Sequence, residues 1–244
     1  MVKTLSTLRA LLTTETSAAL PRISAAQLLD APENKALREL WTEPPTDPSV
    51  YANKRIAVIA TDGVEEIELT TILHYFKSRR AVVDLISPKK PNYPAYLGLQ
   101  IPEQRATHIV TIHYIETAGW IAFDKTLDEV AASQYDAFII PGGTWNPDVL
   151  RAEPKVISLI NKAADAGKIV AAICHGPWVL SDAGVLKGKR ATAWWSVRPD
   201  LENAGATYLD EAVVIDGNFV TSRAPIDLVP FVEAIGGLLT VGAN

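Results

Sequence analysis

The chain has 244 residues, of which 48% are hydrophobic and 21% charged, and its formal net charge is −5. This is the composition of an ordinary soluble globular protein, and an acidic balance without a basic cluster argues against a nucleic-acid partner. A single cysteine excludes an intramolecular disulfide framework and a thiolate zinc cluster. No apolar run approaches the roughly 20 residues that cross a bilayer. We therefore expect a cytoplasmic protein with no membrane association.

Residues 1–50 predict a helical arm that precedes a main domain at 51–244. Four leucines fall at helical spacing within the first twelve residues, and a second helical pattern runs over 24–41. The proline-rich stretch 43–49 is typical of a stiff linker, so we place the domain boundary there. Residues 1–14 have basic but no acidic side chains, and an organellar transit peptide is an open alternative to a mature arm.

From residue 54 onward, short β-rich runs alternate with helical patterns, which is typical of a doubly wound α/β sheet. The expected strands are 55–60, 81–87, 109–115, 137–140, 168–173, 191–193, 212–215 and 219–222, and the expected helices are 65–78, 126–132, 155–166, 197–204, 227–235 and one that opens near 178. Ligands of such sheets bind beyond the carboxyl ends of the strands. The segments that follow residues 60, 140 and 173 meet this condition together.

The cysteine lies where a buried strand meets a helix. Residues 169–180 read Ile-Val-Ala-Ala-Ile-Cys-His-Gly-Pro-Trp-Val-Leu, so Cys174 ends a small-apolar run and His175, Gly176 and Pro177 follow it. A sharp strand-to-helix turn lifts a nucleophile above the sheet, and the N–H groups of a helix start favour thiolate over thiol. We interpret Cys174 as a nucleophile; the alternative is a buried cysteine that only fills space.

Two further loops are expected beside this cysteine. Glu65 and Glu68 share one helix face, and a carboxyl group beside a thiolate would hold it by hydrogen bonding and be pushed toward its protonated form. The alternative is that these acids only favour a helix start. In the loop 141–148, Gly142 and Gly143 offer backbone N–H groups to a developing oxyanion, although a plain turn has the same glycines.

A nucleophilic cysteine needs a base, and the chain has four histidines. His74 falls in a predicted helix, where packing is favoured, and His108 and His113 fall in a less regular segment. His175 is the candidate base by its proximity in the sequence, and spacing alone does not identify its carboxylate partner. No pair of histidines has helical ligand spacing with an acid, so no metal site is expected.

Several ordered motifs resemble the ThiJ/PfpI superfamily, and in particular its PfpI branch. They are the cysteine segment 172–180, the strand and turn Asp-Ala-Phe-Ile-Ile-Pro-Gly-Gly at 136–143, Glu-Glu-Ile-Glu at 65–68, and the tail motifs Asn-Ala-Gly-Ala at 203–206, Val-Val-Ile-Asp-Gly-Asn at 213–218 and Thr-Ser-Arg-Ala-Pro-Ile-Asp-Leu at 221–228. The resemblance runs from about residue 55 to 238, and residues 88–133 are longer than is usual in the family. It implies a flavodoxin-like three-layer sandwich with a mostly parallel sheet and a cysteine nucleophile elbow.

The resemblance also implies roles for the site residues. Cys174 would be the nucleophile and Glu68 the carboxyl group that contacts it. His175 would be completed by an acid from a neighbouring subunit, which matches Asp148 here. This implies a homo-oligomer, either a dimer or a hexamer. Family activities imply a small-molecule substrate and no cofactor.

The expected function is a cofactor-independent cysteine enzyme that acts on small reactive carbonyls, of the glyoxalase III or deglycase type. The alternatives are a PfpI-type cysteine peptidase or small-substrate hydrolase or hydratase, and a non-enzymatic redox-sensing or chaperone-like stress protein. A glutamine amidotransferase is excluded, because no histidine follows His175. Trp145, Trp178, Trp194 and Trp195 are expected to surround the pocket and narrow it for a small substrate; core packing is the alternative.

Overall fold

The computed structural model describes residues 29–90, 93–98 and 100–241. The leucine-rich helical pattern and the alternative transit peptide, both predicted from the first residues of the chain, lie outside this described part. Within it, no helix is both long and apolar enough to cross a membrane.

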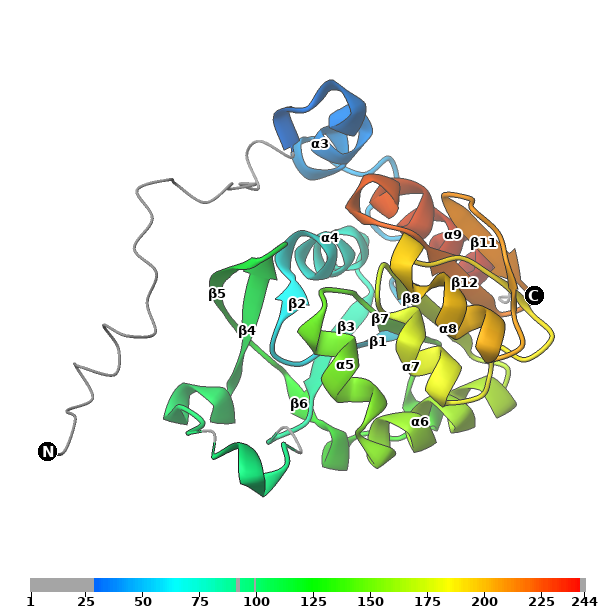
Figure 1. Ribbon diagram of the computed structural model, residues 1–244. Helices are drawn as coiled ribbons and strands as arrows, with labels where there is room; N and C mark the ends of the chain where they lie inside the picture. The colour runs from blue at the N-terminus through cyan, green and yellow to red at the C-terminus, as the bar shows by residue number, and fades with distance from the viewer. Residues whose placement is uncertain (1–28, 91–92, 99, 242–244) are drawn as a thin grey trace, which may run out of the picture.

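A seven-stranded sheet forms the centre of the molecule (Figure 1). In spatial order its strands are β11 (Val213–Asp216), β12 (Phe219–Ser222), β8 (Ile169–Ile173), β7 (Ala137–Ile140), β1 (Arg55–Ile59), β3 (Val82–Ser87) and β6 (Lys125–Thr126). All neighbours are parallel except β11 and β12, which form the hairpin expected around residues 216–218. Strands β7 and β8 are buried along their whole length, which explains their unbroken apolar sequences.

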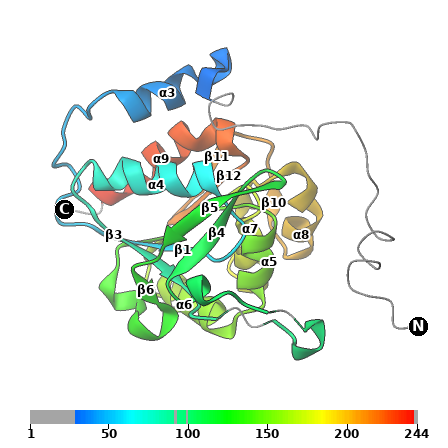
Figure 2. The ribbon, with the colours of Figure 1, turned by 90° about the vertical axis from the view of Figure 1, so that its left-hand side faces the viewer.

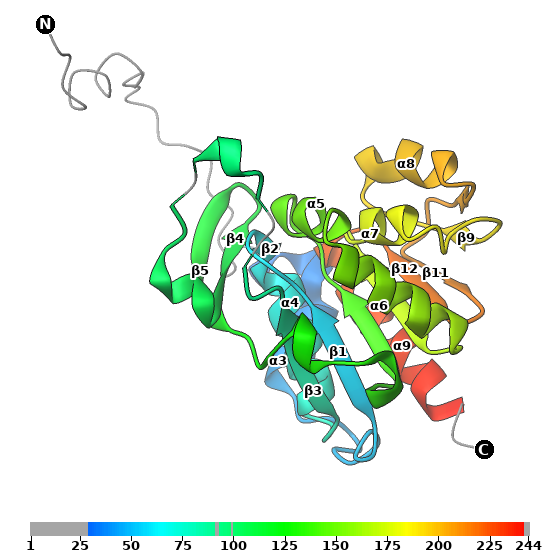
Figure 3. The ribbon, with the colours of Figure 1, turned by 90° about the horizontal axis from the view of Figure 1, so that it is seen from below.

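Helices cover both faces of the sheet and complete the predicted three-layer α/β sandwich (Figures 1 and 3). One layer has α4 (Glu66–Lys77) and α9 (Leu228–Val241), and the other has α5 (Trp145–Arg151), α6 (Pro154–Asp165), α7 (Pro177–Asp182) and α8 (Arg198–Asn203). Two apolar cores, one on each side of the sheet, hold the layers together. Helix α9 runs further than the predicted 227–235, because Leu239 is also buried in its core.

The segment 88–133 is more regular than the sequence suggests. Strand β4 (His108–His113) pairs with β5 (Glu116–Ala122) in an antiparallel hairpin, and β2 (Val64–Glu65) joins β4 to form a second, three-stranded sheet. The helix predicted at 126–132 is wrong. Two 3-10 turns, Leu127–Glu129 and Ala132–Gln134, occupy that region, because the Glu129 carboxylate bonds back to Thr126 and closes the first turn after three residues.

Short elements connect these layers and bring distant parts of the chain together. The remaining strands are β9 (Arg190–Ala191) and β10 (Thr207–Tyr208), and the other 3-10 turns are Pro32–Asn34, Ala95–Leu97, Glu103–Ala106, Trp195–Val197 and Pro225–Asp227. Strand β9 is shorter than the predicted 191–193 and pairs with β10 alone. The chain that leaves β9 returns toward Cys174, because the Trp194 N–H donates to the Cys174 carbonyl at 2.8 Å.

The described part of the N-terminal arm lies on the helical layer made by α4 and α9 (Figure 2). Its helix α3 (Lys35–Thr42) buries Leu37 in the core cluster of that layer. The Trp41 ring stacks on His74 of α4 at 4.4 Å between centroids, and its indole N–H donates to Thr71 Oγ1 at 3.1 Å. His74 is therefore a packing residue, as its place in a helix predicted.

The close contact between α9 and the linker gives the first prediction. A Cβ added at Gly236 would collide with Tyr51 Oη and lie 2.9 Å from Tyr51 Cζ, and this ring is buried against Tyr75 and Phe76. Gly236→Ala should lower the free energy of unfolding by about 1–3 kcal/mol, measured by urea denaturation.

The adjacent glycine is the matched control. Gly237 is exposed on the same helix with nothing within 4 Å of its added Cβ, so Gly237→Ala should be neutral or stabilise by up to about 1 kcal/mol. Equal effects of the two substitutions would contradict the described packing of α9.

Candidate active site

Cys174 lies at the turn between β8 and α7, at the carboxyl edge of the sheet. Its backbone has φ +60, a left-handed conformation that non-glycine residues rarely adopt. The turn is fixed on both sides, since the Cys174 N–H donates to the Ser222 carbonyl at 3.0 Å and its own carbonyl accepts from Trp194. The strand, turn and helix therefore follow one another as the sequence predicts.

Gly142 lies against the cysteine because β7 and β8 are neighbours in the sheet. Ile140 pairs with Ala172, so the residues that follow the two strands meet beyond the same edge. A Cβ on Gly142 would lie 2.5 Å from Cys174 Cβ and 2.8 Å from Glu68 Oε2. Only glycine fits this close approach without moving the site.

The glycine N–H groups are directed to the candidate site residues. The Gly142 N–H donates to Glu68 Oε2 at 2.6 Å, so this group is occupied by the carboxyl group in the structure. The Gly143 N–H interacts with the Cys174 thiol and favours its ionised form. Of the two groups expected to face an oxyanion, one therefore fixes Glu68 and the other faces the sulfur.

Glu68 is fully buried in the first turn of α4. Burial first, and then the charge of Glu65, raise its pKa to about 8, although the bond from Gly142 and the contact with Cys174 act in the opposite direction. Its second oxygen, Oε1, has no N–H or O–H partner within the described residues. The carboxyl group is therefore protonated at neutral pH, as its predicted position beside a negative group requires.

The Cys174 thiol does not have the lowered pKa that a helix start predicts. Burial raises its pKa, and the Glu68 carboxylate adds to this through its charge and its hydrogen bond. The N–H groups of Gly143 and His175 act in the predicted direction, but they are outweighed. The expectation was wrong because it considered the turn without the buried acid that faces it. The two groups hold at least one proton between them at neutral pH.

His175 contacts the sulfur and lies between aromatic rings. Its Nδ1 is 3.3 Å from Cys174 Sγ, a contact that the turn makes possible for adjacent residues. The Trp178 ring meets the imidazole edge-on with centroids 5.1 Å apart, and Trp194 stacks on it at 5.6 Å. Burial lowers the pKa of His175 to about 4, so the imidazole is neutral at neutral pH and available as a base.

Glu65 lies near this cluster but bonds in another direction. Its Oε2 accepts from the Tyr114 N–H at the tip of the β4–β5 hairpin, at 2.9 Å. Burial raises its pKa to about 7, and the neighbouring Glu66 adds to the shift. Glu65 therefore supports the loop beside the site and increases the negative field at Glu68.

Asp148 does not lie in a loop. The predicted loop 141–148 becomes helix α5 from Trp145 onward, because Asn146 caps the turn from within: its side-chain amide donates to the carbonyls of Pro141 and Gly142, and its oxygen accepts from Thr61. Asp148 is exposed on this helix and makes no hydrogen bond to His175 within the described residues.

The tryptophans divide into two groups. Trp178 and Trp194 contact His175, whereas Trp145 and Trp195 are 58% and 72% exposed in the protomer. The exposed pair does not roof a pocket within this chain.

Other predicted candidates lie elsewhere. His113 Nε2 is 3.6 Å from Glu66 Oε1, and His108 contacts Thr107. Among the described residues, no group of three or more histidine, cysteine, aspartate or glutamate side chains could hold a metal ion. Arg151, at the end of α5, contacts Trp178 and was missed, because nothing in the local sequence pairs it with a residue 27 positions away.

The fold and the residues around Cys174 define a flavodoxin-like α/β sandwich with a buried thiol at the carboxyl edge of its sheet. The profile of the DJ-1/PfpI family matches residues 54–236. The chain belongs to the DJ-1/PfpI family.

Known relatives agree with this assignment. The chain is 34% identical to Deglycase TK1284 of Thermococcus kodakarensis over 185 residues, which cover 76% of this chain and 99% of that protein. It is 40% identical to the putative cysteine protease YraA of Bacillus subtilis over 179 residues, 73% of this chain and 94% of the other. The crystal structure of Drosophila melanogaster DJ-1beta superposes with a TM-score of 0.65 at 26% identity, covering 77% and 90% of the two chains.

The raised pKa values predict how stability depends on pH. Glu65 and Glu68 have pKa values of about 7 and about 8 in the folded chain against 4.5 as the reference, so the folded state binds protons that the unfolded state has released. The free energy of unfolding should then fall as the pH rises through this window. His175 has the opposite sign, but its contribution is complete above 6.5.

Between about pH 6.5 and about pH 8.5 we expect the Tm to fall, with a loss of a few kcal/mol from these carboxyl groups. Glu68→Gln should remove most of this fall, and Glu66→Gln, on the same turn, should retain it. Thermal melts of the three proteins across this range check the expectation, and a wild-type Tm that is constant or rises would contradict it.

Proposed function

We infer that this protein is a cofactor-independent cysteine enzyme of the deglycase type that acts on small reactive carbonyls such as methylglyoxal or its adducts. The observation that carries the proposal is the buried cluster in which Cys174 contacts a neutral His175 and a protonated Glu68. Such a cluster supplies a nucleophile, a base and an acid without any further group. Relatives that bear the name deglycase support the substrate class.

The first step forms a bond between Cys174 Sγ and the aldehyde carbon. The carbonyl electron pair moves to oxygen, which takes a proton from Glu68, and the thiol proton passes to the imidazole or to the carboxylate left behind. The product is a hemithioacetal. A raised pKa suits Glu68 to this role, because a carboxyl group that keeps its proton at neutral pH can donate it to the developing alkoxide.

The second stage moves hydrogen within the adduct. Neutral His175 removes the proton from the former aldehyde carbon, and the resulting enediol takes a proton at the neighbouring carbon to give a lactoyl thioester on Cys174. Water then hydrolyses the thioester and releases lactate and the thiol. The balance is methylglyoxal plus water to lactate, so no external oxidant or reductant is needed.

Asp148 is proposed to complete His175 from a neighbouring subunit. Its exposure on α5, beside the exposed Trp145, suits a residue that meets a second copy of the chain. A carboxylate on the second imidazole nitrogen would fix the tautomer and stabilise the imidazolium formed when His175 takes a proton. The site of this proposal is therefore shared between subunits of a homo-oligomer.

Lactate formation tests the proposed reaction. Purified protein with methylglyoxal should produce lactate, and Cys174→Ala should reduce the rate to the uncatalysed background. The same pair of proteins is then assayed for release of lactate from a methylglyoxal-modified N-acetylcysteine or N-acetylarginine. Lactate from neither source, together with cysteine-dependent cleavage of unfolded peptides, would contradict the proposal and favour a peptidase.

Subunit complementation tests Asp148. Asp148→Asn should lower kcat by about 10²-fold or more, since an orienting carboxylate is lost. When the Cys174→Ala and Asp148→Asn chains are coexpressed, activity should return to about a quarter of wild type, because one site in four then joins an intact cysteine to a partner's intact aspartate. No recovery in mixed oligomers would contradict a shared site.

A further inference from the structure

Arg151 joins three helices behind the candidate active site. Its Nε and Nη2 lie 2.5 Å and 3.0 Å from the two carboxylate oxygens of Asp182 on α7, which makes a two-point contact. The same Nη2 is 3.9 Å from Asp200 Oδ1 on α8. The residue itself ends α5, the helix that bears Asp148.

The guanidinium group also contacts the aromatic wall of the site. Trp178 precedes Asp182 by four residues, so both side chains lie on one face of α7. The Arg151 Cζ atom is 5.3 Å from the Trp178 ring centroid, within the range of a cation–π contact. The other side of this contact chain is His175, whose ring meets Trp178 at 5.1 Å.

Trp178 is held by its ring contacts. Its indole Nε1 is buried and makes no hydrogen bond within the described residues, so no polar anchor fixes its rotamer. The ring is therefore free to reorient once the cation on one side is removed. His175 depends on this ring in turn, because its hydrogen-bond contact in the described chain is with the mobile proton of Cys174.

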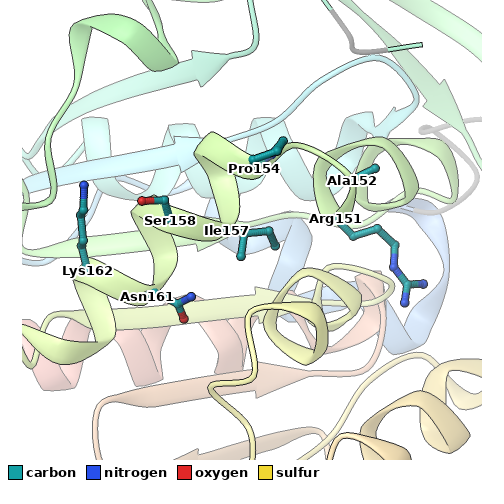
Figure 4. A pocket seen from close by; sticks show the side chains of 7 residues that line it. All are labelled: Arg151, Ala152, Pro154, Ile157, Ser158, Asn161 and Lys162. Atoms are coloured by element: carbon teal, nitrogen blue, oxygen red, sulfur yellow. The ribbon is translucent and has the colours of Figure 1, made fainter. Parts of the chain in front are cut away.

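The surface beside Arg151 contributes no ligand groups to this contact. Figure 4 shows the guanidinium directed away from Pro154 and Lys162, at the edge of an open groove of about 540 Å³ between the end of α5 and α6. Cys174, His175 and Glu68 do not line this groove. Arg151 is 27% exposed, and its polar partners are on the opposite side, toward α7 and α8.

We propose that Arg151 is a positioning residue, which locks Trp178 against His175 and thereby holds the imidazole beside Cys174. This inference rests on the proposed roles of Cys174 and His175. It assigns Arg151 no contact with substrate. Its effect on the reaction passes through the tryptophan ring.

Loss of the lock should change the environment of the imidazole. The ionisable groups around His175 are Cys174 on its own turn and Glu68 on α4, and behind Trp178 lie Arg151 and Asp148 of α5, Asp182 of α7 and Asp200 of α8. Burial is the cause of the lowered pKa of His175. If Trp178 swings away, water reaches the ring and the pKa should rise toward 6.5, its ordinary value.

The test uses Arg151→Met in the full-length protein. The imidazole C–H resonance of His175, assigned by its absence in His175→Gln, is titrated by NMR, and kcat and KM are measured for methylglyoxal. We expect the pKa of His175 to rise by about one unit or more and kcat to fall about tenfold with KM within about twofold, since a small displacement of a catalytic base slows chemistry more than binding. Arg151→Lys, which keeps the charge but not the two-point contact, should restore part of both.

Two further variants keep the test decisive. Arg198→Met is the matched control, because Arg198 pairs with Glu202 at 2.8 Å and lies 5.4 Å from the Tyr208 ring on α8; it should change neither readout. Asp182→Asn weakens the same lock while it retains Arg151, and it replaces Arg151→Met if that protein does not fold. An unchanged pKa of His175 in the folded variant would overturn the proposal.

The NMR titration needs no substrate. A chain that forms no lactate, but in which Arg151→Met shifts the His175 titration, would refute the proposed reaction and retain the lock.

Discussion

The candidate site depends on one close contact, in which a buried carboxyl group, a thiol and a glycine backbone occupy the space of a single side chain. Glu68 reaches this place from the first turn of α4, Cys174 from the end of β8 and Gly142 from the end of β7. Parallel pairing of β7 with β8 brings the two turns to one edge of the sheet, and the missing Cβ of Gly142 lets them touch. The fold therefore determines this chemistry through sheet order before any side-chain preference acts.

Burial then determines which groups keep their protons. The same desolvation raises the pKa values of Glu68 and Cys174 and lowers that of His175, because each charged form loses its water. The result is an acid and a base that are ready at neutral pH, beside a thiol that must give up its proton during the reaction. Aromatic contacts around His175 sustain this state, which connects the distant Arg151 to the site.

Much of this arrangement was predictable from local sequence. The apolar runs at β1, β3, β7 and β8 predicted the parallel sheet, and the Cys-His-Gly-Pro sequence predicted the turn at Cys174, because buried strands and sharp turns have short-range signals. Helix α5 was missed because its start, Gly-Gly-Thr-Trp-Asn-Pro, has the composition of a turn, and its stabilising bonds from Asn146 reach Thr61 across 85 residues. The direction of the pKa shift at Cys174 was missed for the same reason: the acid that decides it lies 106 positions earlier, on a different element.

Protonation of Glu68 is the central claim, and infrared difference spectroscopy tests it most directly. Spectra of the wild type minus Glu68→Gln, recorded from about pH 6 to about pH 9.5, isolate the carbonyl stretch of this carboxyl group. The account predicts a protonated-acid band at neutral pH that disappears with a midpoint of about 8. A carboxylate band already present at pH 6, with no protonated form at neutral pH, would contradict it.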